Sequence, residues 1–331
     1  MNAARRLAGG ALLASALATL VSMPVPVQAQ AAWPERPLRI ITAAAPGSGL
    51  DILTRTLARQ LQQRLQQPVI VENKPGANQI IAADACAKSA PDGYTFCTTA
   101  VEPYTSNAFL FRKLPYDPDG FTPVAMLTTL IAGIVARTDL GARTLAEIVA
   151  LSKQQPGRLN WGSYGPGSNS HLYLEAVRTQ FGWDVTHVPY KSTIDATQAI
   201  VARDVHLVYM QIGQPLRKHI DDGELRLIAY AGERRSPSWP DVPTFAEVGL
   251  GDYLIRGWWG MVAPGGTPAP IVQKMNDLAQ AIVNAPESRE LLKSLSVEPY
   301  APNSPADMAA NIRANREVVR AALTRAGVQA N

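Results

Sequence analysis

Hydrophobic residues repeat with two different spacings near the start of the chain. Between residues 51 and 67 a leucine recurs at every fourth position, from Leu53 to Leu65, with Arg and Gln between them. This spacing places the leucines on one face of an amphipathic helix. The flanking segments 37–42 (PLRIIT) and 68–72 (PVIVE) are short, apolar and β-branched, which predicts buried strands.

The alternation of strand and helix continues to residue 99. Asn73-Lys74-Pro75-Gly76 has the composition of a turn and precedes a helix predicted over 78–88. Pro91-Asp92-Gly93 ends this helix, and a third strand is predicted over 94–99. Strands that alternate with helices predict an α/β fold, with a parallel sheet covered by helices.

A second α/β unit is predicted after about residue 130. Thr144 and Glu147 have the T-x-x-E spacing of a capping box, which marks the start of a helix. The pattern then predicts strands over 159–163, 185–188, 205–209 and 225–231, and helices over 168–181 and 194–203.

The last part of the chain is predicted to be mainly helical. An extended segment over 254–263 precedes helices over 268–284, 288–295 and 304–326. We expect the long last helix to pack back on the first unit. Lobe 1 would then comprise 33–130 plus 255–331 and lobe 2 would comprise 131–254, with hinges near 128–132 and 250–256.

Residues 1–29 have the features of a secretory signal peptide. Arg5 and Arg6 precede an apolar stretch from Leu7 to about Val25, and the small residues of Val27-Gln28-Ala29 follow. A membrane anchor is the alternative, but the apolar stretch is short for a span of about 20 residues. We therefore predict export to the periplasm and a mature chain of about 300 residues, which suggests two domains.

The charge of the chain argues against nucleic acid as a partner. The net charge is +4, from 31 basic and 27 acidic residues, and it falls to +2 without Arg5 and Arg6. The sequence contains no run of five or more Lys and Arg residues.

The motifs of common enzymes and cofactor sites are missing. The four histidines lack H-x-x-x-H and H-x-H spacing, so no metal is expected. Neither Ser48, Ser163 nor Ser168 lies in G-x-S-x-G, which disfavours a serine hydrolase. Gly47-Ser48-Gly49 has two glycines of G-x-G-x-x-G, but Ile52 occupies the third position, so no dinucleotide cofactor is expected.

The chain has two cysteines, Cys86 and Cys97. Cys86 lies near the end of the helix predicted over 78–88, and Cys97 lies in the strand that follows. An oxidising compartment permits a disulfide between them, because the strand can run back beneath its helix. Two buried thiols are the alternative.

Two loops rich in small residues precede predicted helices. The first is 45–49 (APGSG), and the second is 162–170 (GSYGPGSNS). Glycine allows close approach of the backbone, and the N–H groups at a helix start attract an anion. Two such loops, one in each lobe, could hold one carboxylate between them. Ordinary tight turns between strand and helix are the alternative.

Six segments in order resemble the periplasmic receptors of the tripartite tricarboxylate transporter family, also called the Bug family. They are PGSGLDILTRTLA (46–58), VIVENKPGANQIIAADACAKSAPDGYT (69–95), GSYGPGSNSHL (162–172), HVPYKST (187–193), PDVPTFAEVGL (240–250) and GWWGMVAPGGTPAPIV (257–272). The resemblance implies a type II periplasmic-binding-protein fold, a two-lobed Venus-flytrap that has no cofactor and catalyses no reaction.

The resemblance also implies a set of ligand-binding residues, which lie mostly in the two loops. They are Ala45, Gly47, Ser48, Gly49 and Asp51 in lobe 1, and Ser163, Gly165, Ser168, Ser170, His171 and Tyr190 in lobe 2. Since Asp51 is an acid, its expected role is to cap its helix or to hold loop amides and water. Aromatic contacts are expected from Tyr104, Tyr164, Tyr209 and Trp258, with one of Trp258 and Trp259 facing the cleft and the other the core.

Two positions depart from the family pattern or complicate it. The family's G-x-V-D pattern reads Arg203-Asp204-Val205-His206 in this chain. His206 therefore stands where the family usually has an acid. Glu102 follows the third predicted strand and is expected to face the cleft. Its carboxylate would repel a second anionic group unless it were protonated or paired, and it could accept hydrogen bonds from a ligand amine or hydroxyl. An exposed loop acid is the alternative.

We therefore predict a monomeric receptor that closes around a small organic acid and delivers it to membrane permease subunits. A dicarboxylate, an aromatic carboxylate or an amino-acid-like acid would suit the two loops. Two alternatives stay open. One is a sensor that signals to a membrane kinase, and the other is an exported hydrolase or isomerase that uses His171.

Overall fold

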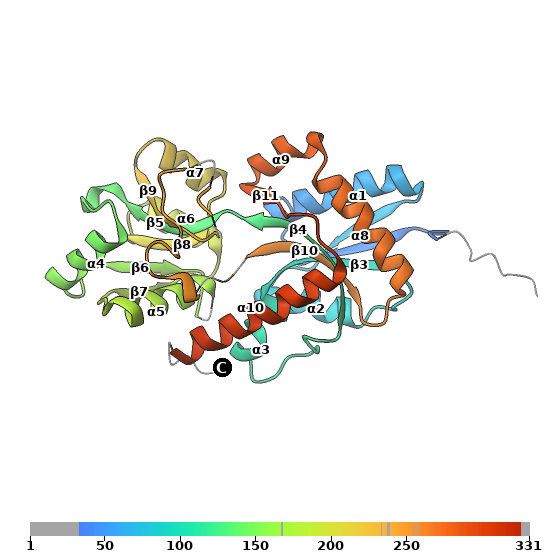
Figure 1. The fold of residues 1–331 in the computed structure, drawn as a ribbon, viewed down its shortest axis with the longest axis horizontal. Helices are drawn as coiled ribbons and strands as arrows, with labels where there is room; N and C mark the ends of the chain where they lie inside the picture. The colour runs from blue at the N-terminus through green and yellow to red at the C-terminus, as the bar shows by residue number, and fades with distance from the viewer. Residues whose placement is uncertain are drawn as a thin grey trace, which may run out of the picture.

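The computed structural model describes residues 33–325, apart from 167, 233, 237–238, 254 and 256. The signal peptide predicted over 1–29 lies outside these residues, as do positions 254 and 256 at the second predicted hinge. The chain forms two α/β lobes, each with its own sheet (Figure 1). The described helices include none that is long and apolar enough to cross a bilayer.

The sheet of lobe 1 has the strand order β11-β4-β10-β3-β1-β2. Its strands are β1 (Leu38–Thr42), β2 (Val69–Asn73), β3 (Thr95–Ala100), β4 (Phe121–Leu130), β10 (Trp258–Pro264) and β11 (Val297–Pro299). Strands β1, β2 and β3 are parallel, as predicted, but β10 runs antiparallel between β3 and β4. The sheet is therefore mixed, because β10 returns from lobe 2 in the opposite direction.

The helices of lobe 1 cover both faces of this sheet (Figure 1). They are α1 (Gly49–Leu65), α2 (Ile80–Ala87), α3 (Asn107–Leu110), α8 (Ala269–Val283) and α9 (Arg289–Ser294). The predicted leucine stripe of α1 is confirmed, since Leu53, Leu57 and Leu61 are buried in the lobe 1 core. Single 3-10 turns are η1 (Ala77–Gln79), η2 (Glu102–Tyr104) and η5 (Pro286–Ser288).

The sheet of lobe 2 has the order β7-β6-β8-β5-β9. Its strands are β5 (Ala132–Arg137), β6 (Asn160–Ser163), β7 (Thr186–Pro189), β8 (Leu207–Gln211) and β9 (Leu225–Tyr230). Its helices are α4 (Leu145–Gln154), α5 (Asn169–Phe181), α6 (Thr193–Val201) and α7 (Gln214–Asp221), with a 3-10 turn η3 (Thr138–Leu140). The capping box of Thr144 and Glu147 at the start of α4 is confirmed.

Two strand connections and one helix join the lobes. Only Ile131 separates β4 from β5, and the return from β9 to β10 passes through η4 (Gly251–Tyr253). The last helix, α10 (Pro305–Arg325), was expected on lobe 1 but runs across both lobes (Figure 1). Met308 and Ile312 are buried in lobe 1, whereas three residues near the end of α10 are buried in the lobe 2 core: Val319, Ala322 and Leu323.

Cys86 and Cys97 form the predicted disulfide, with their Cα atoms 6.2 Å apart. The bond joins the last turn of α2 to the middle of β3. It therefore fixes this helix against the sheet of lobe 1, within the core of that lobe.

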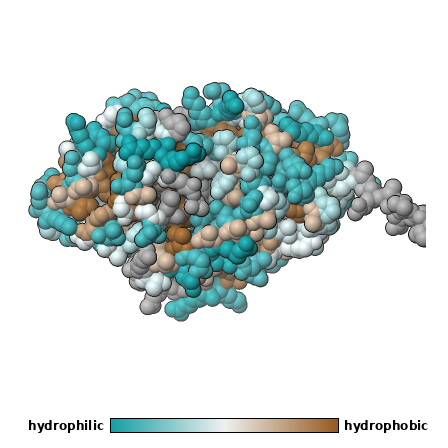
Figure 2. Space-filling model, in the orientation of Figure 1, coloured by the Kyte–Doolittle hydropathy of each residue, from teal (hydrophilic) through white to brown (hydrophobic). Residues whose placement is uncertain are grey.

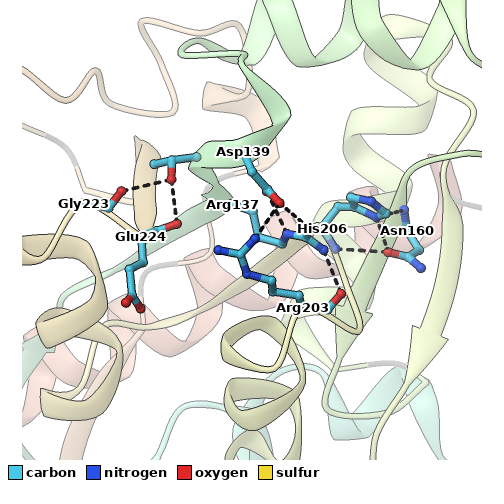
Figure 3. A network of polar contacts seen from close by, with 8 residues as sticks. Arg137, Asp139, Asn160, Arg203, His206, Gly223 and Glu224 are labelled. Atoms are coloured by element: carbon cyan, nitrogen blue, oxygen red, sulfur yellow. Dashed lines mark hydrogen bonds and ion pairs between the residues drawn. The ribbon is translucent and has the colours of Figure 1, made fainter.

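The segment Arg203–His206 joins a polar network at the start of β8 (Figure 3). Arg137 pairs with Asp139 and donates to the carbonyl oxygen of Arg203 at 2.7 Å. The Arg203 guanidinium also donates to Asp139, at 3.1 Å, and the backbone N–H of His206 donates to Asn160 Oδ1 at 3.0 Å. The segment that departs from the family pattern thus links the end of β5 and the start of β6 to the start of β8 in the lobe 2 sheet.

Candidate functional site

A cavity of about 250 Å³ lies between the two lobes, and residues of both lobes line it. The lobe 1 side consists of Asn78, Gln79, Ala100, Glu102, Gly257 and Trp259, and Leu130 lies at the junction. The lobe 2 side consists of Ala132, Tyr164, Asn169, Thr193, Tyr209, Gln211 and Ala231. The walls are mostly apolar and aromatic with a few polar groups, which is typical of a small-molecule site.

A larger hollow, of about 930 Å³, lies in lobe 2 alone, between α4, the strand β9 and residues 241–249. Figure 2 shows a mostly hydrophilic face, with apolar side chains gathered toward the lobe 2 end of the molecule. Because this hollow lies in one lobe only, we take the smaller cavity between the lobes as the candidate site.

Glu102 links the two walls of the cavity. Its Oε2 atom accepts a hydrogen bond from Gln79 Nε2 at 3.1 Å, within lobe 1. Its Oε1 atom accepts one from Asn169 Nδ2 at 3.2 Å, and Asn169 belongs to lobe 2. Burial raises the pKa of the Glu102 carboxyl above its ordinary value. Hydrogen bonds from its own backbone and from Gln79 lower this pKa, but by less than burial raises it.

The backbone of η1 orients Gln79. Ala77, Asn78 and Gln79 all have positive φ, at 46°, 50° and 69°, a conformation that non-glycine residues rarely adopt. The Gln79 Oε1 atom accepts the Ala100 N–H at 2.9 Å and the Thr99 hydroxyl at 3.0 Å. These bonds fix which end of the amide is the acceptor, so that the Nε2 end is directed to Glu102.

The first small-residue loop is held by Asp51. This side chain is 2% exposed and accepts the Gly47 N–H at 2.8 Å, Asn73 Nδ2 at 2.7 Å and Arg55 Nε at 3.1 Å. Burial acts to raise the pKa of Asp51, but the hydrogen bonds from Asn73, Gly47 and Arg55 outweigh it and hold the pKa below its ordinary value. The expectation that Asp51 holds loop amides therefore agrees with its contact to Gly47.

The other residues of the first loop do not line the cavity. Ala45, Gly47 and Ser48 are exposed, and Ser48 precedes α1 without a side-chain capping bond. A Cβ at Gly49 would lie 2.7 Å from the ring of Trp259, so glycine is needed for this contact. Trp259 lines the cavity and contacts Gly49, so its ring lies between the start of α1 and the cavity.

The second loop is organised by a pair of histidines. Ser163 Oγ lies 2.6 Å from His187 Nε2 and accepts the Gly165 N–H at 3.2 Å. The rings of His187 and His171 are stacked, with centroids 4.4 Å apart. Ser163 is fully buried. His187, stacked on His171, therefore supports the turn at Gly165 through Ser163.

The remaining predicted residues of lobe 2 have mostly structural contacts. Ser168 caps α5 by accepting the His171 N–H at 3.4 Å, and its hydroxyl donates to the Gly165 carbonyl at 2.7 Å. Ser170 is fully buried and accepts a bond from Trp161 Nε1 at 3.0 Å. The backbone N–H of Tyr190 donates to the Ser163 carbonyl at 2.8 Å.

Of the predicted ligand-binding residues, Glu102 lines the cavity. Among the aromatic candidates, Tyr164 and Tyr209 also line it, whereas Tyr104 stacks on Trp258 in the lobe 1 core. Trp259 is the member of its pair that faces the cavity. The cavity has five polar lining residues that the sequence did not single out: Asn78, Gln79, Asn169, Thr193 and Gln211. The first four lie within segments that carry the family resemblance or form the second loop.

His187 should make the stability of the folded protein depend on pH. Burial and the nearby His171 and Arg178 lower the pKa of His187 from 6.5 to about 4. Between these values the unfolded chain binds a proton that the folded chain does not, so stability falls as the pH falls from 6.5 to 4. Urea unfolding at a series of pH values measures this fall.

A His187→Gln variant provides the comparison. The acidic side chains contribute alike to both proteins, so the variant is expected to lose less stability than the wild type over this pH range. Parallel pH profiles would show that His187 does not titrate as expected.

Among residues 33–325, apart from the gaps given above, no group of three or more His, Cys, Asp or Glu side chains could hold a metal.

Residues 53–320 match the family described as the tripartite tricarboxylate transporter family receptor. The chain belongs to this receptor family. The structure of the periplasmic binding protein BugD, with a TM-score of 0.76 and 28% identity, covers 90% of this chain and all of that one. The protein is therefore a solute-binding receptor of this family rather than an enzyme.

Relatives of the receptor family agree over most of their length. A protein of Cupriavidus necator, named UPF0065 protein in gbd 5'region, is 35% identical over 298 residues, or 88% of each chain. The structure of R. palustris Rpa4515 with adipate has a TM-score of 0.79 and 28% identity, covering 90% of this chain and all of that one. MatC from Rhodopseudomonas palustris with bound malate has a TM-score of 0.72 and 31% identity, covering 86% of this chain and 99% of that one. The two-lobed type II periplasmic-binding-protein fold is confirmed.

Proposed function

We propose that this receptor captures a small organic acid, either a dicarboxylate or an aromatic carboxylate, in the cavity between its lobes. The observation that carries the proposal is that both lobes supply polar groups to this cavity, with Glu102 on one side and Asn169 on the other. Relatives that were solved with adipate and malate support the choice of ligand class.

Closure of the lobes is the proposed means of capture. A ligand that contacts both lobes binds the closed form more tightly than the open form, and so shifts the population toward closure. The bond from Asn169 to Glu102 is one contact that closure forms and opening breaks. We place the lobe boundaries at the predicted positions, with lobe 1 over 33–130 plus 255–331 and lobe 2 over 131–254.

The two small-residue loops are proposed to hold the ligand carboxylate, in part through water. Asn169 begins α5 and lines the cavity, and Gly49 begins α1 beside Trp259, which also lines it. Asp51 fixes the first loop, and the histidine pair fixes the second. Both loops would therefore be ordered before the ligand binds.

The chain is proposed to act in the periplasm as a monomer. The signal peptide predicted over 1–29 would direct export, and the closed form would deliver its solute to membrane permease subunits. The Cys86–Cys97 disulfide supports an oxidising compartment.

A screen of organic acids tests the proposal. The mature protein is mixed with dicarboxylates and aromatic carboxylates and melted, and the hits are titrated by calorimetry. A ligand at about 100 times its Kd stabilises the folded state by about 2.7 kcal/mol, which raises the Tm by about 5 °C or more. Absence of any shift, or conversion of a bound acid into product by NMR, would contradict the proposed function.

A further inference from the structure

The charge of the cavity limits what the second polar group of the ligand can be. Among the described residues that line the cavity, Glu102 is the only one with a carboxyl group. Tyr164 and Tyr209 are the other titratable groups there, and burial raises the pKa of both hydroxyls, so they stay neutral. Lys, Arg and His are absent from this described lining.

The neighbours of Glu102 present its carboxylate as an acceptor. Each of its two oxygens already accepts one amide N–H, from Gln79 and from Asn169. The Gln79 amide cannot turn over without losing the bonds of its oxygen to Ala100 and Thr99. Glu102 is thus held in place with lone pairs left for one further donor.

A second carboxylate on the ligand would fit this wall poorly. It would lie near the Glu102 carboxyl group with no described cationic side chain in the cavity to compensate, so one of the two carboxyl groups would have to hold a proton. An ammonium group would neutralise the carboxylate that burial has made costly, and its hydrogen bond would be charge-assisted.

We infer that the natural ligand carries an ammonium group as well as its carboxylate, and that Glu102 accepts a hydrogen bond from that ammonium group. The inference rests on the proposed capture of a small organic acid and assigns that acid to the amino acids in the broad sense. Asn169 of lobe 2 donates a hydrogen bond to the same carboxylate, so this bond and the bond to the ligand ammonium group would both form when the lobes close.

The test uses pairs of acids in which a methyl group replaces the ammonium group without changing the size. The pairs are aspartate and methylsuccinate, 4-aminobutyrate and pentanoate, and 6-aminohexanoate and heptanoate, with adipate as the plain dicarboxylate. Calorimetry gives the Kd of each for the wild type, for Glu102→Gln and for Glu290→Gln. Glu290 is exposed on α9, so its variant removes the same charge outside the cavity.

We expect the ammonium member of at least one pair to bind the wild type about 10- to 100-fold more tightly than its methyl partner. Glu102→Gln should remove most of that ratio, and Glu290→Gln should leave it unchanged. The amide is close in size to the carboxylate, and the Tm without ligand shows whether the variant is folded.

Three results would overturn the inference. In the first, the methyl members bind as tightly as their partners. In the second, the ratio persists in Glu102→Gln. In the third, dicarboxylates or aromatic acids bind while every ammonium member fails, which removes the inference and leaves the proposed function standing. If no acid of any class binds, the proposed function itself fails.

Discussion

Replacing Gly133 with alanine is expected to destabilise lobe 2 by about 3 kcal/mol. Gly133 lies in β5, which is paired on both sides, by β8 and by β9. A Cβ there would lie 2.3 Å from the carbonyl oxygen of Ala229, an atom of the neighbouring backbone that cannot turn aside. The strands would have to separate. Urea unfolding measures the loss.

Gly120→Ala is the matched control. Its Cβ would meet Asp117 at 3.2 Å in a turn rather than in a sheet, so the cost should stay below about 1 kcal/mol. Because Ala132 and Ala231 of the same sheet line the cavity, ligand affinity should fall together with stability in Gly133→Ala. If Gly133→Ala unfolds with the same midpoint urea concentration as the wild type, the sheet accommodates the Cβ without cost and the prediction is wrong.

Replacing Asp51 with alanine is expected to weaken ligand binding about 100-fold and to lower stability by about 2–3 kcal/mol. The substitution leaves the Gly47 N–H and the Asn73 amide without their shared acceptor, so the loop before α1 loses its fixed shape. Calorimetry with an acid identified in the screen, and urea unfolding, measure the two effects.

Asp307→Ala is the control for loss of a carboxylate at the start of a helix. Asp307 accepts the Ser304 N–H at 2.8 Å and is exposed, so its loss should cost about 1 kcal/mol and leave binding unchanged. If Asp51→Ala binds as tightly as the wild type while Asp307→Ala behaves as expected, the first loop does not form part of the site.

Much of the fold could be predicted because its signals are local. The leucine spacing of α1 and the capping box of α4 each depend on residues within a few turns. The disulfide also follows from a helix and the strand after it, which are neighbours in sequence. The antiparallel insertion of β10 could not be predicted, because it depends on a partner strand about 130 residues earlier, β4.

The cavity was harder to predict than the fold. The role of Gln79 depends on three successive residues with positive φ, and Ala77-Asn78-Gln79 carries no glycine to mark them. Asn169 was passed over in favour of the serines beside it, yet Ser168 and Ser170 bond within lobe 2 while Asn169 reaches lobe 1. Of the two loops marked from sequence, the second contributes Asn169 to the cavity, but the direction of its side chain depends on the packing of the other lobe.

The placement of α10 has a consequence for the order in which the protein folds. Val319, Ala322 and Leu323 belong to the core of lobe 2, although that lobe is otherwise built from the middle of the chain. During synthesis or export from the N-terminus, the middle segment of the chain is complete long before these residues emerge. Lobe 2 therefore has an open apolar face until the final helix docks, so the chain reaches its stable state only after its last residues are present.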